Sequence, residues 1–258
     1  MGLVSMLLAT YTLWRRDIVR FYRQPSRIAG ALGTPVIFWL LLGSGLGTSF
    51  RAATQGATET GYLAYFYPGT LALILLFTAI FSTISVIEDR RDGFLQGVLV
   101  APVPRVSIAL GKIFGGATLA LLQAAIFLLL APAANVHLNW AMLPMLMVVL
   151  GALAFALTGL GFILAWMLDS TQGFHAVMNL FLLPMWLLSG AVFPADGAAG
   201  WIRGVMFVNP MTYGITAIRA VLTAGEMHLG DEIVEPLLFI GLFGLLTLAG
   251  STWSVTRR

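Results

Sequence analysis

The chain has 258 residues, of which 59% are hydrophobic and only 10% are charged, and its formal net charge is +3. A soluble domain carries about 25% charged residues, so this composition excludes an ordinary soluble protein. The chain contains no cysteine, which excludes disulfides, iron–sulfur clusters and a thiol nucleophile. Apolar runs of about 20 residues recur, each long enough to cross a hydrocarbon core of roughly 30 Å. Because the runs are continuously apolar and do not alternate, we expect an all-α polytopic membrane protein and not a β-barrel.

The first 27 residues have the pattern of an amphipathic helix. Four arginines recur at helical spacing, and three apolar residues occupy another face: Arg16, Arg20, Arg23 and Arg27, and Trp14, Ile18 and Phe21. A helix that lies among lipid headgroups shows this pattern, and positive charge that follows the apolar stretch does not fit a signal peptide. We therefore expect a cytoplasmic interfacial helix over 1–27 that ends near Pro25. The alternative is a positively charged flank without a further role.

Six transmembrane helices are expected after this segment. They fall at 28–48, 66–87, 106–131, 140–167, 173–193 and 233–253. Most of the arginines and the single lysine lie on one side of these spans, and the positive-inside rule places that side and both termini in the cytoplasm. The whole chain, 1–258, is expected to form one transmembrane domain of the cytoplasmic (inner) membrane. Because the arginines follow the membrane edge, no nucleic-acid partner is expected.

The outer connection from 194 to 232 is long but not polar. Two of its stretches, GWIRGVMFV and MTYGITAIRAVLTAG, are apolar and helix-like, and Asn209-Pro210 separates them. Each stretch is too short to cross a bilayer alone. Backbone of this kind is tolerated at membrane depth where protein buries it. We therefore expect an outer re-entrant helical segment made of two half-helices.

The stretch EDRRDGFLQGVLVAPVPR at 88–105 combines mixed charge with an apolar ridge. Its charged residues are Glu88, Asp89, Arg90, Arg91, Asp92 and Arg105, and its ridge consists of Phe94, Leu95, Val98 and Leu99 at helical spacing, bracketed by Gly93 and Pro102. The positive-inside rule explains the arginines but not the three acidic residues among them. We expect a short amphipathic helix on the cytoplasmic face that docks into a protein groove. The alternative is a solvated loop.

An aromatic cluster opens the second span. Tyr62, Tyr65, Phe66 and Tyr67 precede Pro68-Gly69. Aromatic residues at this depth are typical of an interfacial belt, which we favour over the alternative that they line a substrate path.

Two glycine pairs have the four-residue spacing that allows helices to approach closely. They are Gly43 with Gly47 and Gly111 with Gly115. Because glycine pairs are common in membrane spans, this spacing indicates no particular contact.

Taken in order, these features resemble the permease subunits of type-2 ATP-binding-cassette exporters, which include drug, lipo-oligosaccharide and polysaccharide exporters. The residues that carry the resemblance are Glu88, Arg90, Arg91 and Gly93, LVAP at 99–102, Gly111-Lys112, SGAVFP at 189–194 with Gly190, Phe193 and Pro194, and NPMTY at 209–213 with Asn209, Pro210 and Tyr213. The resemblance covers nearly the whole chain. The sequence departs from the family's pattern at Phe94 and Gln96, where threonine and glutamate are common, so Gln96 offers a neutral hydrogen bond and no salt bridge.

The resemblance implies that 88–105 is a coupling helix gripped by a separate ATPase. The charged residues from Glu88 to Asp92 would contact that ATPase, and the apolar ridge would fill its groove. Since the chain has no G-x-x-x-x-G-K-[ST] loop, ATP and Mg are expected on the partner, and no cofactor on this chain. The resemblance also implies a second permease copy, as a homodimer, and export of a drug or of an amphipathic, lipid-linked or carbohydrate-containing substrate.

Two other classes of function fit less well. An intramembrane enzyme would need a motif such as G-x-S-x-G or H-E-x-x-H, and the sequence contains neither. An ion channel or a proton-coupled carrier without an ATPase partner would need polar or charged residues at mid-membrane depth. The centres of the expected spans are nearly free of such residues, so a channel or carrier is kept as the alternative.

Overall fold

The computed structural model describes residues 3–45, 61–194, 197–223 and 230–257, and these residues form helices and connections without a β-strand. The longer helices are α1 (Leu3–Tyr22), α2 (Pro25–Gly45), α4 (Tyr62–Arg91), α6 (Arg105–Leu128), α7 (Leu143–Met167), α11 (Pro210–Thr223) and α12 (Asp231–Thr256). The shorter ones are α5 (Phe94–Val100), η1 (Ala131–Ala134), η2 (Trp140–Met142), α8 (Thr171–Val177), η3 (Met178–Leu182), α9 (Leu183–Leu187) and α10 (Gly200–Val208).

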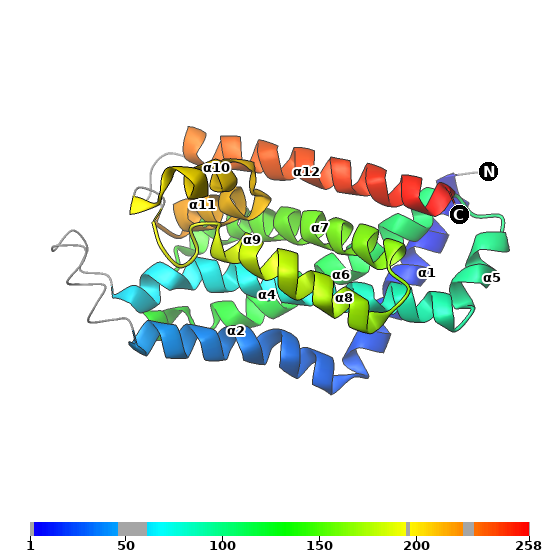
Figure 1. Ribbon diagram of the computed structural model, residues 1–258, viewed down its shortest axis with the longest axis horizontal. Coiled ribbons are helices and arrows are strands. Elements are labelled where there is room, and N and C mark those ends of the chain that lie inside the picture. Colours follow the sequence, from blue (N-terminus) through cyan, green and yellow to red (C-terminus); the bar gives the residue numbers. More distant parts are fainter. Residues whose placement is uncertain (1–2, 46–60, 195–196, 224–229, 258) are drawn as a thin grey trace.

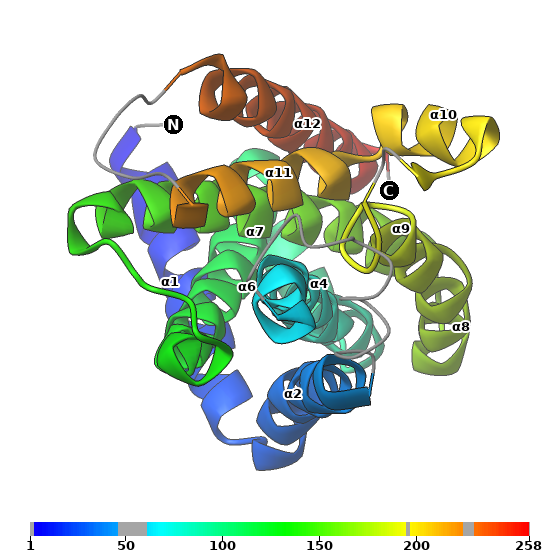
Figure 2. The same cartoon turned by 90° about the vertical axis from the view of Figure 1, so that its left-hand side faces the viewer.

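The long helices form one bundle whose two ends carry different elements. Figure 1 shows α2, α4, α6, α7 and α12 running along the bundle, with α5 and both termini at one end and α10 and α11 at the other. Helix α1 crosses the bundle direction at the end that holds the termini (Figures 1 and 2). Seen along the bundle, α4 lies in the centre (Figure 2). We call the end with α5 the α5 end.

Five helical segments are long and apolar enough to cross a membrane. They are Pro25–Gly45, Tyr62–Arg91, Arg105–Leu128, Trp140–Met167 and Glu232–Thr256. The count rises to six if α10 and α11, bent by 83° at their junction, are taken as one span. An all-helical membrane protein was expected from the sequence, and this expectation is confirmed.

The span expected at 173–193 takes a different form. From Thr171 to Leu187 the chain forms α8, the π-helical turn η3 and α9 in succession, and none of them is long enough to be a span by itself. Pro184 has no N–H to donate to the carbonyl of Leu180, and the π turn ends two residues before this proline, at Leu182. Because the segment is apolar throughout, its sequence did not indicate this interruption.

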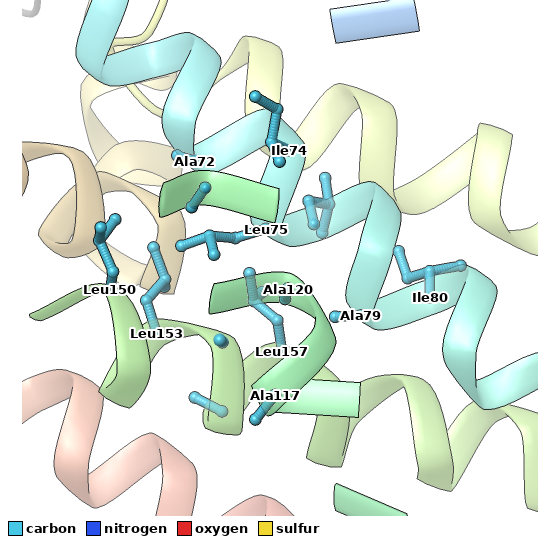
Figure 3. Close-up of a cluster of buried hydrophobic side chains, with 14 of the residues drawn as sticks. Ala72, Ile74, Leu75, Ala79, Ile80, Ala117, Ala120, Leu150, Leu153 and Leu157 are labelled. Atoms are coloured by element: carbon cyan, nitrogen blue, oxygen red, sulfur yellow. The ribbon is translucent and has the colours of Figure 1, made fainter. Parts of the chain in front are cut away.

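Small residues in the centre of the bundle allow α4, α6 and α7 to pack closely. The contact is built from Ala72, Leu75 and Ala79 of α4, Ala117 and Ala120 of α6, and Leu150, Leu153 and Leu157 of α7 (Figure 3). A Cβ atom on Gly116 would lie 2.3 Å from Ser82 Oγ and 2.6 Å from Thr158 Cγ2. Only glycine therefore fits at this position, where the three helices meet.

The second glycine pair brings α6 against α1. A Cβ atom on Gly111 would lie 2.7 Å from Leu13 Cβ, and one on Gly115 would lie 3.2 Å from Asp17 Cβ. Both glycines therefore allow α1 to lie close to α6. Gly43 approaches Leu63 of α4, while Gly47, the other member of its pair, lies outside the described residues.

Candidate functional site

Helix α5 is joined to the central helix α4 by a single tight turn. Gly93 has φ = +76°, a left-handed conformation that favours glycine, and it directly precedes Phe94, the first residue of α5. Helix α5 has seven residues and is followed by Pro102 and Pro104 before α6 begins at Arg105. The short helix expected within 88–105 is confirmed.

The apolar ridge of α5 faces the protein itself. Leu95 is only 1% exposed, and Phe94, Val98 and Leu99 pack against the same hydrophobic core. The exposed face of α5 and its flanks consists of Arg91, Asp92, Gln96, Gly97, Val100 and Pro102. Since the ridge is occupied within the chain, these exposed residues form the surface that a partner can reach. We call this surface the α5 face.

Directly before α5, the last turns of α4 carry a buried ionic cluster centred on Asp89. The Asp89 side chain is 0% exposed and accepts two hydrogen bonds from Arg16, both of 2.7 Å, and one of 2.6 Å from Arg20. Lys112 Nζ of α6 donates to Asp89 at 2.5 Å and to Asp17 of α1 at 2.8 Å. One carboxylate therefore joins three helices, α1, α4 and α6.

Glu88 extends this cluster to a fourth helix. Arg20 Nη2 donates to Glu88 at 2.9 Å, and Arg27, near the start of α2, forms an ion pair with the other carboxylate oxygen. We define the Asp89 cluster as Asp17, Arg16, Arg20, Arg27, Glu88, Asp89 and Lys112. It connects α1, α2, α4 and α6 at the α5 end of the bundle.

Two members of the cluster on α1 have shifted pKa values. The hydrogen bond to Asp89 raises the pKa of Arg16, against the effect of burial. Burial raises the pKa of the Asp17 carboxyl above its usual value, and the contact with Lys112 only partly offsets this rise. Asp17 is therefore the carboxylate for which charge is costly, whereas Arg16 is held firmly in its charged form.

Arg90 and Arg91 bind a different part of the chain. Arg90 forms an ion pair with Asp169 and donates to the carbonyl oxygen of Trp166 at the end of α7. Arg91 Nε donates to the carbonyl oxygen of Asp169 at 3.1 Å. The end of α4 is thus attached to the α7–α8 connection on its other side.

Two residues complete the region around α5. The guanidinium carbon of Arg16 lies 3.6 Å from the centroid of the Phe94 ring, which links α1 directly to α5. Nη1 of Arg105 is buried without a hydrogen-bond partner among the described residues. The sequence interpretation identified Arg105 but missed α1 and Lys112 as part of this site.

The aromatic cluster of α4 points into the protein. Tyr62, Phe66 and Tyr67 are buried, and the hydroxyl groups of the two tyrosines donate to the carbonyl oxygens of Val192 and Phe127. Tyr65, which is half-buried, donates to Gly190 O at 3.4 Å. The expected lipid-facing belt is wrong for the three buried rings, because neighbouring helices cover them. A role in a substrate path stays a prediction.

At the opposite end, Asn209 fixes the bend between α10 and α11. Its Nδ2 donates to the carbonyl oxygens of Met185 at 2.6 Å and Leu188 at 3.1 Å, and its Oδ1 accepts from Met211 N. Tyr213 donates to Phe207 O at 2.8 Å. The two helical pieces expected on either side of Asn209-Pro210 are therefore present as α10 and α11.

The turn before α10 contains the other residues singled out in this segment. Gly190 has φ = +81°, and its carbonyl oxygen accepts from Arg219 Nη2 at 3.3 Å. Phe193 is half-buried, and Pro194 is exposed. The structure thus brings Gly190 and Arg219 together with Tyr65 at this end of the bundle, where Arg219 lies 4.6 Å from the Tyr65 ring.

This helical bundle, with several helices long and apolar enough to cross a membrane, defines a multi-pass membrane protein. A family model described as ABC-2 type transporter matches residues 9–223, so the chain belongs to this family of transport permeases. The family identification bears out the resemblance stated from the sequence.

Three relatives illustrate the range of the family. A protein of Cyanophora paradoxa named transport permease ycf38 is 29% identical over 229 residues, covering 87% of this chain and 78% of the relative. Nodulation protein J of Rhizobium leguminosarum bv. viciae is 28% identical over 233 residues, covering 89% and 86%. A protein of Escherichia coli named multidrug ABC transporter permease YbhR is 24% identical over 200 residues, covering 75% of this chain and 51% of the relative.

Proposed function

We propose that this chain is the membrane subunit of an ATP-driven exporter and that a separate ATPase binds the α5 face. The family implies an ATP-binding-cassette ATPase as partner. The observation that carries the proposal is the construction of α5: a short helix with its apolar ridge docked on the bundle, an exposed outer face, and a link to α4 of only two residues, Asp92 and Gly93. In this scheme the partner binds ATP and Mg, and the chain is not itself an enzyme.

The Asp89 cluster supports a mechanical role for this helix. Movement of α5 reaches α4 through Gly93 and α1 through the contact of Arg16 with Phe94. From Asp89 it reaches α6 through Lys112. Because these contacts are charged and geometrically specific, α1, α4 and α6 are expected to respond together when the ATPase moves α5.

The contacts with the ATPase are assigned to exposed groups. Arg91, Asp92 and Gln96 offer polar contacts, and Val100, which is 85% exposed, offers an apolar one. Nη1 of Arg105 is buried, so Arg105 is not among these exposed groups. Glu88, Asp89 and Arg90 act from behind this surface, by fixing the position of α5.

The proposal also fixes an orientation in the inner membrane. The α5 end, with both termini, lies in the cytoplasm, α1 lies along the inner membrane surface, and α10 with α11 forms a re-entrant segment at the outer side. Two copies of the chain enclose the pathway. The cargo is a drug or an amphipathic, lipid-linked or carbohydrate-containing molecule, a range supported by the relative named as a multidrug transporter permease.

The test is co-purification of an ATPase under mild extraction. The disrupting variant is Gly97→Asp/Val100→Asp, because both positions are exposed on the α5 face and a Cβ atom at Gly97 would meet nothing within 4 Å. The matched control is Arg203→Gln/Thr223→Glu, which makes the same change of −2 in net charge with two exposed side chains at the other end of the bundle. We expect the ATPase to accompany the intact chain and the control and to be lost from the disrupting variant. If the folded, intact chain brings down no ATPase, the exporter proposal fails and a channel or carrier becomes the better hypothesis.

A further inference from the structure

The arginines at the start of the chain fall into two sets. Arg16, Arg20 and Arg27 form ion pairs with Glu88 or Asp89. Arg15 and Arg23 are exposed, and their guanidinium groups form no hydrogen bond, ion pair or ring contact within the part of the chain that the structure describes. The ionic cluster therefore accounts for only one of the two sets.

The free arginines line an open groove along α1. The groove has a volume of about 630 Å³, and four arginines line it: Arg15, Arg16, Arg20 and Arg23. No acidic side chain of the described residues lines it. Since Asp89 and Glu88 hold Arg16 and Arg20 in place, the groove is a preformed positive site. The guanidinium groups of Arg15 and Arg23 form no interaction with the described residues and are available to a ligand.

Apolar side chains are exposed on the same helix. Leu7, Leu8 and Tyr11 are exposed towards its N-terminus, and Val19 and Tyr22 are exposed among the arginines. Tyr11 and Val19 also line the groove. A ligand that suits this surface needs both an anionic group and an apolar part, because guanidinium groups bind phosphate in a bidentate manner and exposed leucines need apolar cover.

We propose that this groove binds the phosphate headgroup of an anionic phospholipid of the cytoplasmic leaflet, held by Arg15 and Arg23. The proposal rests on the placement of α1 at the inner membrane surface in the proposed function. A zwitterionic lipid fits less well, because its ammonium group would lie among four arginines. A free phosphate would use the guanidinium groups but leave the apolar side chains uncovered. An acidic segment of a protein would likewise lack acyl chains to cover Leu7 and Leu8.

The experiment measures lipid binding to the full chain. The delipidated protein in neutral detergent is titrated with dioleoylphosphatidylglycerol, with dioleoylphosphatidylcholine and, separately, with inorganic phosphate, and bound species are counted by native mass spectrometry. The test variant is Arg15→Gln/Arg23→Gln. The control variant is Arg203→Gln/Arg257→Gln, which removes the same charge from exposed positions outside the groove. A third variant, Arg15→Lys/Arg23→Lys, keeps the charge but loses the bidentate geometry.

We expect preferential binding of phosphatidylglycerol. The test variant should bind it about 30-fold more weakly, which corresponds to about 1 kcal/mol for each arginine. The control variant should bind it as the intact chain does, and the lysine variant should fall in between. Because both replaced side chains are exposed, the melting temperature of the test variant should stay unchanged, which separates loss of binding from loss of fold.

Four results would overturn the proposal. Equal binding of the two lipids, or no effect of the test variant, would show that the groove does not recognise the headgroup. Competition by inorganic phosphate at the same concentration as the lipid would identify a site for free anions. Loss of ATPase co-purification in the test variant, with lipid binding unchanged, would assign the groove to a protein. Failure of the proposed function is distinguishable, because it shows as absence of the ATPase from the intact chain whatever lipid is bound.

Discussion

Replacement of Asp89 by asparagine should destabilise the protein strongly, whereas the same replacement at Asp17 should not. Asp89 accepts hydrogen bonds from Arg16, Arg20 and Lys112, and its side chain has no exposed surface. In Asp89→Asn one oxygen becomes an NH₂ group, which needs a hydrogen-bond acceptor but faces donor groups of Arg16, Arg20 and Lys112. The three cations then lose their shared negative partner.

The magnitude follows from the burial of the partners. Removal of one member of a buried ion pair costs about 3–5 kcal/mol. Arg16 and Arg20 are 32% and 25% exposed and can regain water, and Lys112, 2% exposed, keeps Asp17. We therefore expect a value near the lower limit, about 3 kcal/mol. At about 2–4 °C per kcal/mol for a chain of this size, the melting temperature should fall by about 6–12 °C.

Asp17→Asn is the matched control, since it makes the same chemical change in the same cluster. Burial raises the pKa of Asp17, so its charged form is disfavoured in the folded protein. A neutral amide oxygen can still accept from Lys112, and the loss of charge is offset by a smaller desolvation cost. The expected change in stability is less than about 1 kcal/mol.

The assay is thermal unfolding of each purified variant in the same detergent, followed by tryptophan fluorescence. The reasoning is refuted if Asp89→Asn unfolds within about 2 °C of the unmodified protein, or if Asp17→Asn is as destabilised as Asp89→Asn. The first result would mean that apolar packing alone fixes α1. The second would mean that Lys112 needs both carboxylates.

The remaining predictions concern pH, packing and orientation. The pKa of Asp17 is raised in the folded protein, so the protonated carboxyl contributes its full stability below the unfolded pKa near 3.8, and this contribution is lost as the pH rises through the raised value. Any stability advantage of Asp17→Asn over the unmodified protein should therefore narrow when thermal unfolding is repeated at lower pH. Gly116→Ala should destabilise the folded protein by about 1–3 kcal/mol through overpacking. Gly151→Ala should not, because there is open space around the new methyl group. Equal unfolding temperatures of the two variants would contradict the packing argument. Since the chain has no cysteine, Gln96→Cys should react with an impermeant maleimide only from the cytoplasmic side and Thr223→Cys only from the outer side, and labelling of both from one side would contradict the proposed orientation.

The elements that could be predicted from the sequence are those that depend on local pattern. Spans at 28–48, 66–87, 106–131, 140–167 and 233–253 correspond to helices of the structure, because each apolar run is long enough to cross a bilayer. Helix α5 follows equally from the periodicity of Phe94, Leu95, Val98 and Leu99.

The partners of the charged residues could not be predicted in this way. Asp89 and Arg16 are 73 positions apart in the chain, and no local pattern states that α1 folds back across α4 and α6. Two signals were present: Lys112 is the single lysine of the chain and lies in an apolar run, and Asp17 is a lone aspartate among arginines. A charge at such a position needs a partner of opposite sign, so Lys112 could have indicated a buried carboxylate.

The direction in which an apolar or aromatic side chain points was equally hidden. The ridge of α5 was expected to fill a partner's groove, and the rings of α4 were expected to face lipid. Leu95 and Phe66 are instead covered by the chain's own helices. Apolar surface is buried by whatever lies nearest, and the nearest neighbour depends on tertiary arrangement.

The five charged residues from Glu88 to Asp92 lie at the end of a helix, and they differ in their partners and in their exposure. Successive residues of a helix point about 100° apart, so five consecutive charges face all sides of α4. Glu88 and Asp89 face α1, Arg90 binds the α7–α8 connection, and Arg91 and Asp92 remain exposed beside α5. Apolar packing alone would let α4 slide or rotate at small cost, whereas ion pairs on opposite sides define both its position and its rotation. In the proposed function, a force on α5 would reach α4 where these ion pairs attach it to α1, α2, α6 and the α7–α8 connection, which would explain why so much of the chain's scarce charge is concentrated there.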